Sequence, residues 1–295
     1  MKKWMMLSII SLLMILASCG NDEGGESEGS GETEDKGEIS IGMNNWAENV
    51  AVSNMWKIIL EEQGYEVTLE NVDKAILYEG LESGDIDIGM EIWLPNTDGK
   101  FYEEYQDVID WREEWYEGTD LALTVPSYVE DVNSIEDLQG NADQFEGEIV
   151  GIDPGASIME LTEEVMSTYE LDNYELLSSS EPTMLTELQT KMDNEEPVVV
   201  TLWKPHWVFA EMDLKLLEDP ENVYGDSENI SYAARLGLED EHPEVVEWFD
   251  NFMLNDDQLG SLMAELNEAD EEAEGAQNWI DDNQDVIDEW LTTDE

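Results

Sequence analysis

The sequence predicts an α/β protein of two lobes, in which each lobe is a mostly parallel β-sheet with helices. Two halves of the chain repeat one order of apolar strands and amphipathic helices, βαβαβ. In each half an apolar run ends in a tryptophan, at Trp93 and at Trp203, and a proline follows two residues later. Because such units bring the carboxyl ends of parallel strands to one edge, we expect both tryptophans to face a binding cleft between the lobes.

The individual elements follow from the periodicity of apolar residues and from the turn residues between them. The first half is predicted to contain strand 39–42, helix 48–63, strand 65–72, helix 75–82 and strand 86–93. The second half repeats this order over 149–153, 157–169, 174–177, 183–192 and 198–203. A crossing strand is predicted at 121–125, a returning segment at 224–234, and helices at 243–254 and 277–291. Residues 38–122 and 232–295 are therefore predicted to form lobe 1, and residues 123–231 lobe 2.

The composition of the chain limits its function. With 295 residues, 41% apolar content and 11 tryptophans, the chain can bury a core of domain size. It carries 75 acidic and 11 basic residues, a net charge of −64, which excludes nucleic acid as a partner because phosphates are repelled. The acidic excess is spread along the whole chain. This favours a halophilic protein, since concentrated salt screens self-repulsion; the alternative is an acidic surface with a specific role.

The amino terminus predicts where the protein is found. Lys2 and Lys3 precede an apolar stretch that is too short to span a bilayer, so residues 1–18 are predicted to be a signal peptide. The sequence Leu-Ala-Ser-Cys that ends at Cys19 is typical of a lipoprotein cleavage site, at which the cysteine is lipidated. The alternative is a plain signal peptide. Residues 19–37 then form an acidic flexible tether, and the domain is held by lipid at the extracellular face of the cell membrane.

Cys19 is also the only cysteine of the chain, which leaves neither a disulfide nor a thiol nucleophile in the domain. An extracellular lipid anchor, two βαβαβ lobes and the absence of a further membrane segment are typical of the solute-binding protein of an importer. Proteins of this class close two lobes over a small ligand, so the predicted fold is periplasmic-binding-protein-like, with the ligand in the cleft between the lobes.

Three tryptophans indicate the kind of ligand. Trp46 follows the first strand, at the same level of the sheet as Trp93, and Trp203 comes from the other lobe. Three indoles around one space attract a desolvated cation, and they suit a quaternary ammonium group, which has no hydrogen to donate. The alternative is that these tryptophans are ordinary core residues.

Four segments make the chain resemble a known family, the glycine betaine/proline betaine-binding lipoproteins of osmoprotectant ABC importers (the OpuAC type). They are GMNNWAEN at 42–49, IWLP at 92–95, IVGIDPG at 149–155 and TLWKPHW at 201–207. They occur in order and with matching separations, and the resemblance covers residues 39–291. It implies that Trp46, Trp93 and Trp203 form a cage around the trimethylammonium group of the ligand.

The resemblance also implies how the carboxylate of the ligand is held. In the family, backbone amides of the Gly-Ile-Asp-Pro-Gly turn bind it, which corresponds to Gly151 and Ile152 here. The turn joins a strand to a helix, where free amides and the helix dipole favour an anion. Many members carry a histidine five residues after the second cage tryptophan, and this chain has Asp98 there. The resemblance therefore predicts that Asp98→His tightens binding. His206 is a further candidate for contact with the ligand.

The sequence contains none of the common catalytic motifs, so we expect no enzyme, no cofactor and no metal site. The predicted function is an extracellular solute-binding protein that captures glycine betaine or a related compatible solute for osmoprotectant uptake. Its expected partners are the membrane permease and the ATPase of an ABC importer. The alternatives are a surface lipoprotein that binds or cleaves carbohydrate on tryptophan platforms and a purely structural surface protein.

Overall fold

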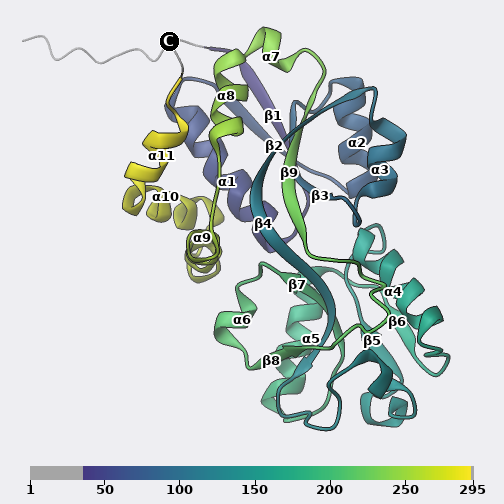
Figure 1. The fold of residues 1–295 in the computed structure, drawn as a ribbon. Coiled ribbons are helices and arrows are strands. Elements are labelled where there is room, and N and C mark those ends of the chain that lie inside the picture. Colours follow the sequence, from purple (N-terminus) through teal and green to yellow (C-terminus); the bar gives the residue numbers. More distant parts are fainter. Residues whose placement is uncertain (1–35, 294–295) are drawn as a thin grey trace, which may run out of the picture. The chain divides into compact units, whose positions relative to one another are not determined.

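Strands alternate with helices throughout the described residues, 36–293, of the computed structural model (Figure 1). The predicted signal peptide, Cys19 and most of the predicted tether lie outside these residues. Lys36 and Gly37, the last two residues of the predicted tether, are hydrogen bonded to the domain. The amide of Lys36 donates to Gly64 O (3.1 Å), and Gly37 O accepts from the amide of Glu66 (2.9 Å). Within residues 36–293, no helix is long and apolar enough to cross a membrane.

The first strand group is built from the predicted βαβαβ unit. Its elements are β1 (Glu38–Met43), α1 (Ala47–Glu62), β2 (Glu66–Asn71), α2 (Lys74–Ser83) and β3 (Ile88–Leu94). β1 pairs with β2 and with β3, both in parallel. α1 covers one face of these strands and α2 the other (Figure 1). α2 packs closely because Gly42 and Gly89 leave room for Leu77, whose Cδ1 occupies space that a Cβ at either glycine would need.

The second strand group repeats the arrangement. It contains β5 (Glu148–Val150), α4 (Ser157–Thr168), β6 (Glu175–Leu177), α5 (Glu181–Asp193) and β7 (Val200–Lys204). β5 pairs in parallel with β6 and with β7. The short strand β8 (Leu214–Leu216) adds to this group through β4.

A long strand, β4 (Ile109–Pro126), runs through both groups. Its first part pairs antiparallel with β9 (Glu228–Arg235), which also pairs antiparallel with β3. Its last part pairs antiparallel with β7 and β8. The strand order is β2-β1-β3-β9-β4-β7-β5-β6. The sheet is therefore mixed, and the parallel strands predicted from the sequence are joined in its middle by two antiparallel ones.

Helices after β9 pack on the first strand group (Figure 1). They are α7 (Leu238–Glu241), α8 (Pro243–Asn251), α9 (Asp256–Glu268), α10 (Glu272–Asp282) and α11 (Gln284–Trp290). Trp56 of α1 is fully buried beneath them. Its ring stacks on Phe249 with centroids 4.0 Å apart and on Trp290 at 6.1 Å. Aromatic stacking thus helps to attach these helices to α1.

The predicted elements of both repeats are present, with boundaries that differ by a few residues. Three expectations were wrong in extent. The crossing strand begins at Ile109 rather than at 121, and the helix predicted over 277–291 is two helices that break at Asn283. The helix predicted over 243–254 ends at Asn251. Further elements had not been predicted, namely α3 (Gly99–Tyr105), α6 (Val208–Glu211), α7, α9, β8 and the 3-10 turns at Ile135–Leu138 and Ala142–Phe145.

Candidate functional site

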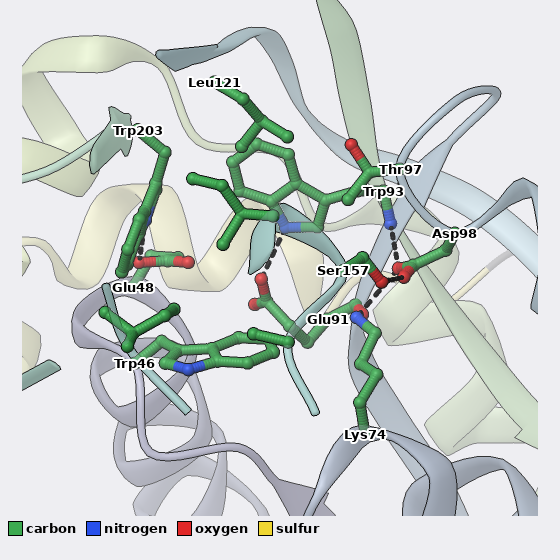
Figure 2. A pocket seen from close by; sticks show the side chains of 13 residues that line it. Trp46, Glu48, Lys74, Glu91, Trp93, Thr97, Asp98, Leu121, Ser157 and Trp203 are labelled. Carbon is green, nitrogen blue, oxygen red and sulfur yellow. Dashed lines mark hydrogen bonds and ion pairs between the residues drawn. The ribbon is translucent and has the colours of Figure 1, made fainter. Parts of the chain in front are cut away.

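Three tryptophans from three separate elements line one pocket (Figure 2). Trp46 precedes the first turn of α1, Trp93 lies near the end of β3, and Trp203 lies on β7. Trp93 and Trp203 are 4% and 3% exposed, whereas Trp46 is half-buried. The geometry therefore brings together the three residues that the sequence analysis singled out.

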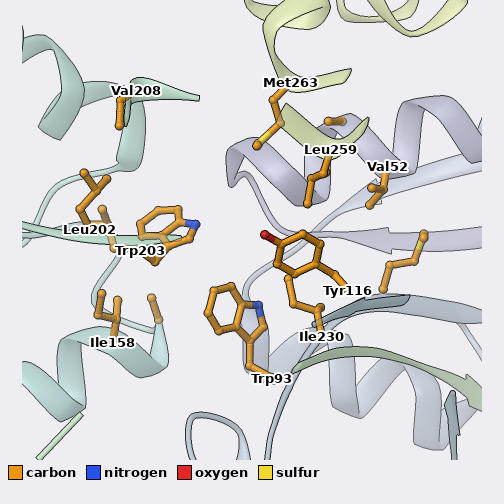
Figure 3. Close-up of a cluster of buried hydrophobic side chains, with 14 of the residues drawn as sticks. Val52, Trp93, Tyr116, Ile158, Leu202, Trp203, Val208, Ile230, Leu259 and Met263 are labelled. Atoms are coloured by element: carbon orange, nitrogen blue, oxygen red, sulfur yellow. The ribbon is translucent and has the colours of Figure 1, made fainter. Parts of the chain in front are cut away.

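Trp93 on β3 and Trp203 on β7 approach the pocket from different sides (Figure 3). Trp93 pairs with Ile230 of β9, and Trp203 pairs with Leu121 of β4, whose side chain also lines the pocket. The first strand group therefore supplies Trp46 and Trp93, and the second supplies Trp203. The peptide bonds Leu94–Pro95 and Lys204–Pro205, which follow the two strand tryptophans, are both cis.

Each strand tryptophan donates its indole N–H to a buried glutamate (Figure 2). Trp203 Nε1 donates to Glu48 Oε2 (2.9 Å), which lies in the first turn of α1. Trp93 Nε1 donates to Glu91 Oε1, two residues earlier on the same face of β3. Glu48 and Glu91 are each 1% exposed. The carboxyl groups fix the planes of the indoles and leave the faces of the rings to the pocket.

Burial changes the ionisation of both glutamates. Loss of hydration raises the pKa of Glu48 to about 8, and the charge of Glu181 adds to this rise, while the indole N–H of Trp203 opposes it. Burial also raises the pKa of Glu91 well above its usual range, helped by the charge of Glu48 and opposed by Lys74. Ionising two buried carboxyl groups that lie close together costs free energy through lost hydration and mutual repulsion. The ligand-free pocket therefore keeps a proton on the Glu48–Glu91 pair at neutral pH.

Asp98 is completely buried and is held by three different elements. Its Oδ2 accepts from the amide of Trp93 (2.9 Å) and forms an ion pair with Lys74 Nζ (2.8 Å). Its Oδ1 accepts from Ser157 Oγ (3.0 Å), at the start of α4 in the second strand group. Lys74 is 3% exposed, donates also to Glu91 O, and has its Nζ 5.4 Å from the centroid of Trp46. Asp98 therefore ties the segment after Trp93 to both strand groups.

The turn after β5 contributes Ile152 to the pocket but not Gly151. The family resemblance assigns the Gly151 amide to the ligand carboxylate, and in this structure the amide has a partner within the protein. This amide donates to Leu177 O (2.8 Å), and Met159 Sδ occupies the space that a Cβ of Gly151 would need. The Ile152 amide faces Met159 Sδ (3.3 Å), a weak acceptor. Ala156, Ser157 and Ile158 also line the pocket, so the start of α4 and its positive dipole end face it.

His206, which the sequence analysis offered as a candidate for contact with the ligand, is not among the residues that line this pocket. Its ring is buried, and both nitrogens are used within the protein. Nδ1 accepts from the amide of Val208 (3.2 Å), which leaves Nε2 to donate to Glu181 Oε1 (3.2 Å). Glu181 Oε2 accepts from the amide of Ala47 (3.0 Å). His206 thus orients the glutamate that joins α5 to the start of α1.

Comparison with known proteins places this geometry in a family. Residues 37–282 match the model of OpuAC, the substrate binding domain of ABC-type glycine betaine transport system. The chain belongs to this family. OpuAC domains are transport binding proteins, which confirms the prediction of a solute-binding protein rather than an enzyme.

Individual relatives agree with this membership. Over 150 residues, 50% of each chain, the protein is 40% identical to the glycine betaine/carnitine transport binding protein GbuC of Listeria monocytogenes. The alignment thus spans about half the length of that relative. Among solved structures, lactococcal OpuAC in its closed-liganded conformation complexed with glycine betaine is 33% identical, with a TM-score of 0.82. The glycine/betaine/L-proline-binding protein ProX of Borrelia burgdorferi is 35% identical, with a TM-score of 0.83. These two matches cover 86% of this chain and 99% and 97% of the other chains.

Five polar residues at this OpuAC pocket were missed from the sequence: Glu48, Lys74, Glu91, Thr97 and Ser157. Lys74 could have been noticed, because cations are scarce in this chain and it begins a helix next to a predicted strand end. The glutamates gave no signal among so many acidic residues. Within residues 36–293, no group of three His, Cys, Asp or Glu side chains is arranged to hold a metal ion.

The ion pair of Asp98 with Lys74 predicts that Asp98→His also destabilises the fold, which the expectation of tighter binding left out. Both Asp98→His and Asp98→Asn leave the Lys74 ammonium buried without its counter-ion, and breaking a buried pair in this way costs about 3–5 kcal/mol. We expect both variants to lower the free energy of unfolding by about that amount in denaturant titrations. The exposed Asp107→Asn serves as control and should stay within about 0.5 kcal/mol of the parent. An Asp98→His protein as stable as the parent would contradict this role of the pair.

The raised pKa of Glu48 predicts how stability depends on pH. Between its ordinary value of 4.5 and about 8, the folded state holds a proton that the unfolded chain releases. The contribution of Glu48 is therefore complete below pH 4.5 and is lost as the pH rises toward and through about 8. We expect Glu48→Gln to flatten the fall in melting temperature of the ligand-free protein across this range. Glu62→Gln, at an exposed position of α1, should keep the parental slope. Equal slopes for Glu48→Gln and the parent would show that Glu48 ionises normally.

Proposed function

We propose that this chain captures glycine betaine, or a related quaternary ammonium compatible solute, outside the cell and delivers it to the permease and ATPase of an ABC importer. The observation that carries the proposal is the convergence of Trp46, Trp93 and Trp203 on one pocket. Membership of the OpuAC family and the likeness to a structure complexed with glycine betaine support it.

The three indoles are proposed to hold the trimethylammonium group of the ligand. Trp93 and Trp203 turn their N–H groups to buried carboxyls, so these rings offer mainly their electron-rich faces to the pocket. A quaternary ammonium group cannot donate a hydrogen bond, and face contacts satisfy it without one. Because the contacts are buried, molar salt should screen them only weakly.

The carboxylate of the ligand is proposed to lie at the opposite end of the pocket, near the start of α4. The amide of Ile152 and the first turn of α4 provide donors and a positive dipole end there. Lys74 supplies the cation, and Asp98 holds it in place. In this proposal the Lys74–Asp98 pair takes the role that a histidine has in many relatives. A site for a carboxylate disfavours choline, which has none.

Capture is proposed to involve closure of two lobes over the ligand. The two strand groups are joined through β4 and β9, and four further contacts connect the two sides of the structure, two of them between residues that line the pocket. The contacts are Trp203 with Glu48, Ser157 with Asp98, Glu181 with the amide of Ala47, and Lys100 with Glu160. We propose that these contacts form on closure and that lobe boundaries lie close to residues 122 and 232, as the sequence indicates.

The position of the domain in the cell is part of the proposal. Lipidation at Cys19 would hold the domain at the extracellular face of the membrane, next to its permease. A net charge of −64 supports a protein that works in concentrated salt, where ions screen its self-repulsion.

The carbohydrate alternative receives no support from the site. Tryptophan platforms for sugars present broad exposed faces, whereas Trp93 and Trp203 are almost completely buried. Their indole N–H groups are also engaged by glutamates rather than directed to a polyhydroxylated ligand.

Calorimetric titration in molar salt tests the proposed function. We expect glycine betaine to bind, choline to bind more weakly, and glycine, which lacks the methyl groups, not to bind. Replacing any one cage tryptophan by alanine should remove about 1–2 kcal/mol of cation–π contact, which raises Kd about 5- to 30-fold. Trp111→Ala, on the part of β4 away from the pocket, should leave Kd unchanged. Equal binding of choline would remove the carboxylate site, and no binding of any of the three would contradict the function.

A further inference from the structure

The pocket contains more carboxyl groups than cationic side chains. Of the 13 residues drawn around it, three have carboxyl groups, Glu48, Glu91 and Asp98, and one has a cation, Lys74. Asp98 is ion paired with Lys74 at 2.8 Å, and this pair is neutral as a unit. The two glutamates are therefore the carboxyl groups of the pocket that have no cationic side chain paired with them at salt-bridge distance.

The same two glutamates lie directly behind the proposed cation cage. Glu48 accepts from the indole of Trp203 at 2.9 Å, and Glu91 accepts from the indole of Trp93. An acceptor with negative charge polarises the indole N–H and makes the ring face more attractive to a cation. Their own charge acts in the same direction, and in a water-poor pocket it acts more strongly than in solution.

We propose that Glu48 and Glu91 are specificity-determining residues, whose shared negative charge makes the cage select a permanent cation over a neutral group of the same shape. This inference rests on the proposed function, because it assumes that a trimethylammonium group occupies the cage. Glu48 lies on α1 and Glu91 on β3. Glu48 accepts from Trp203 of the second strand group, whereas Glu91 accepts from Trp93 of the first. Both carboxyl groups thus belong to the first strand group, and the hydrogen bond from Trp203 to Glu48 joins them to the second.

Selection by charge is linked to a proton. In the ligand-free pocket, burial and mutual repulsion keep a proton on the glutamate pair, with the pKa of Glu48 raised to about 8. A bound cation favours the ionised form and expels that proton. The affinity for a cationic ligand should therefore rise with pH as the pH approaches about 8.

The other titratable groups around Glu48 and Glu91 are Lys74, Glu181 and Tyr78. Lys74 from α2 is paired with Asp98, and Glu181 from α5 is bonded to His206 and to the amide of Ala47. Tyr78 of α2, near Asp98 and Glu91, has its pKa raised well above its usual range by burial and by these charges, so it stays neutral while the glutamate pair titrates.

The experiment compares two ligands of the same shape. The probe is 3,3-dimethylbutanoate, in which a carbon replaces the nitrogen of glycine betaine, so that the methyl groups and the carboxylate remain and the positive charge is lost. Kd is measured by calorimetry for both ligands with the parent, Glu48→Gln and Glu91→Gln. Glu62→Gln, exposed on α1, is the control. Melting curves confirm that each variant is folded.

We expect the parent to prefer glycine betaine strongly and each glutamine variant to lose about tenfold or more of that preference, the size expected for one charge a few ångströms away. The loss should come from weaker glycine betaine binding, with 3,3-dimethylbutanoate bound equally well or better. An unchanged preference in both folded variants overturns the inference but leaves the proposed function intact. Binding of neither ligand to the parent overturns both.

A second measurement on the parent protein does not depend on the folding of any variant. Binding enthalpies at pH 7 in buffers of different ionisation enthalpy give the number of protons exchanged. We expect glycine betaine to release protons and 3,3-dimethylbutanoate to release none. Equal proton exchange for both ligands would overturn the inference, since a merely structural carboxyl pair does not distinguish a cation from its neutral isostere.

Discussion

Two buried carboxyl groups behind the indoles determine how this pocket is organised. Glu48 and Glu91 fix the planes of Trp203 and Trp93, and Glu48 does so across the boundary between the two strand groups. Burying them costs hydration, which their raised pKa values express. The structure offsets this cost with indole N–H donors, a retained proton and, in our proposal, the positive charge of the ligand. The pocket is thus less stable empty than filled, which favours tight capture of a cation.

The surrounding residues support the same design. Lys74 lies close to the ring of Trp46, where its positive charge would oppose a cationic ligand. Its ion pair with Asp98 neutralises that charge. His206 orients Glu181, which bonds to the start of α1 next to Trp46. A cage that relies on buried ring faces and carboxyls also suits an acidic protein in salt, because exposed ion pairs would be screened there and buried contacts are not.

Much of this could be predicted from the sequence, because regular patterns carry it. The apolar runs that end at Trp93 and Trp203 specify strands, and their repetition places the tryptophans at equivalent strand ends. The mixed centre of the sheet could not be predicted in the same way. β4 between Ile109 and Thr119 is rich in charged and polar residues, and its pairing with β9 is interrupted by several register shifts, so alternation is lost. Glu48 and Glu91 could not be predicted as pocket residues for a different reason. Nothing in the local sequence distinguishes a buried glutamate from the many exposed ones. The use of the Gly151 amide by Leu177 depends on the neighbouring strand, which the sequence of the turn does not reveal.

The most direct test of this account is a crystal structure of the protein with glycine betaine. We expect the ligand nitrogen to lie within about 6 Å of the ring centroids of Trp46, Trp93 and Trp203. Its carboxylate should point to Ile152, the start of α4 and Lys74. A ligand whose methyl groups lie outside these three rings, or whose carboxylate lies beside Glu48 and Glu91, would contradict the account.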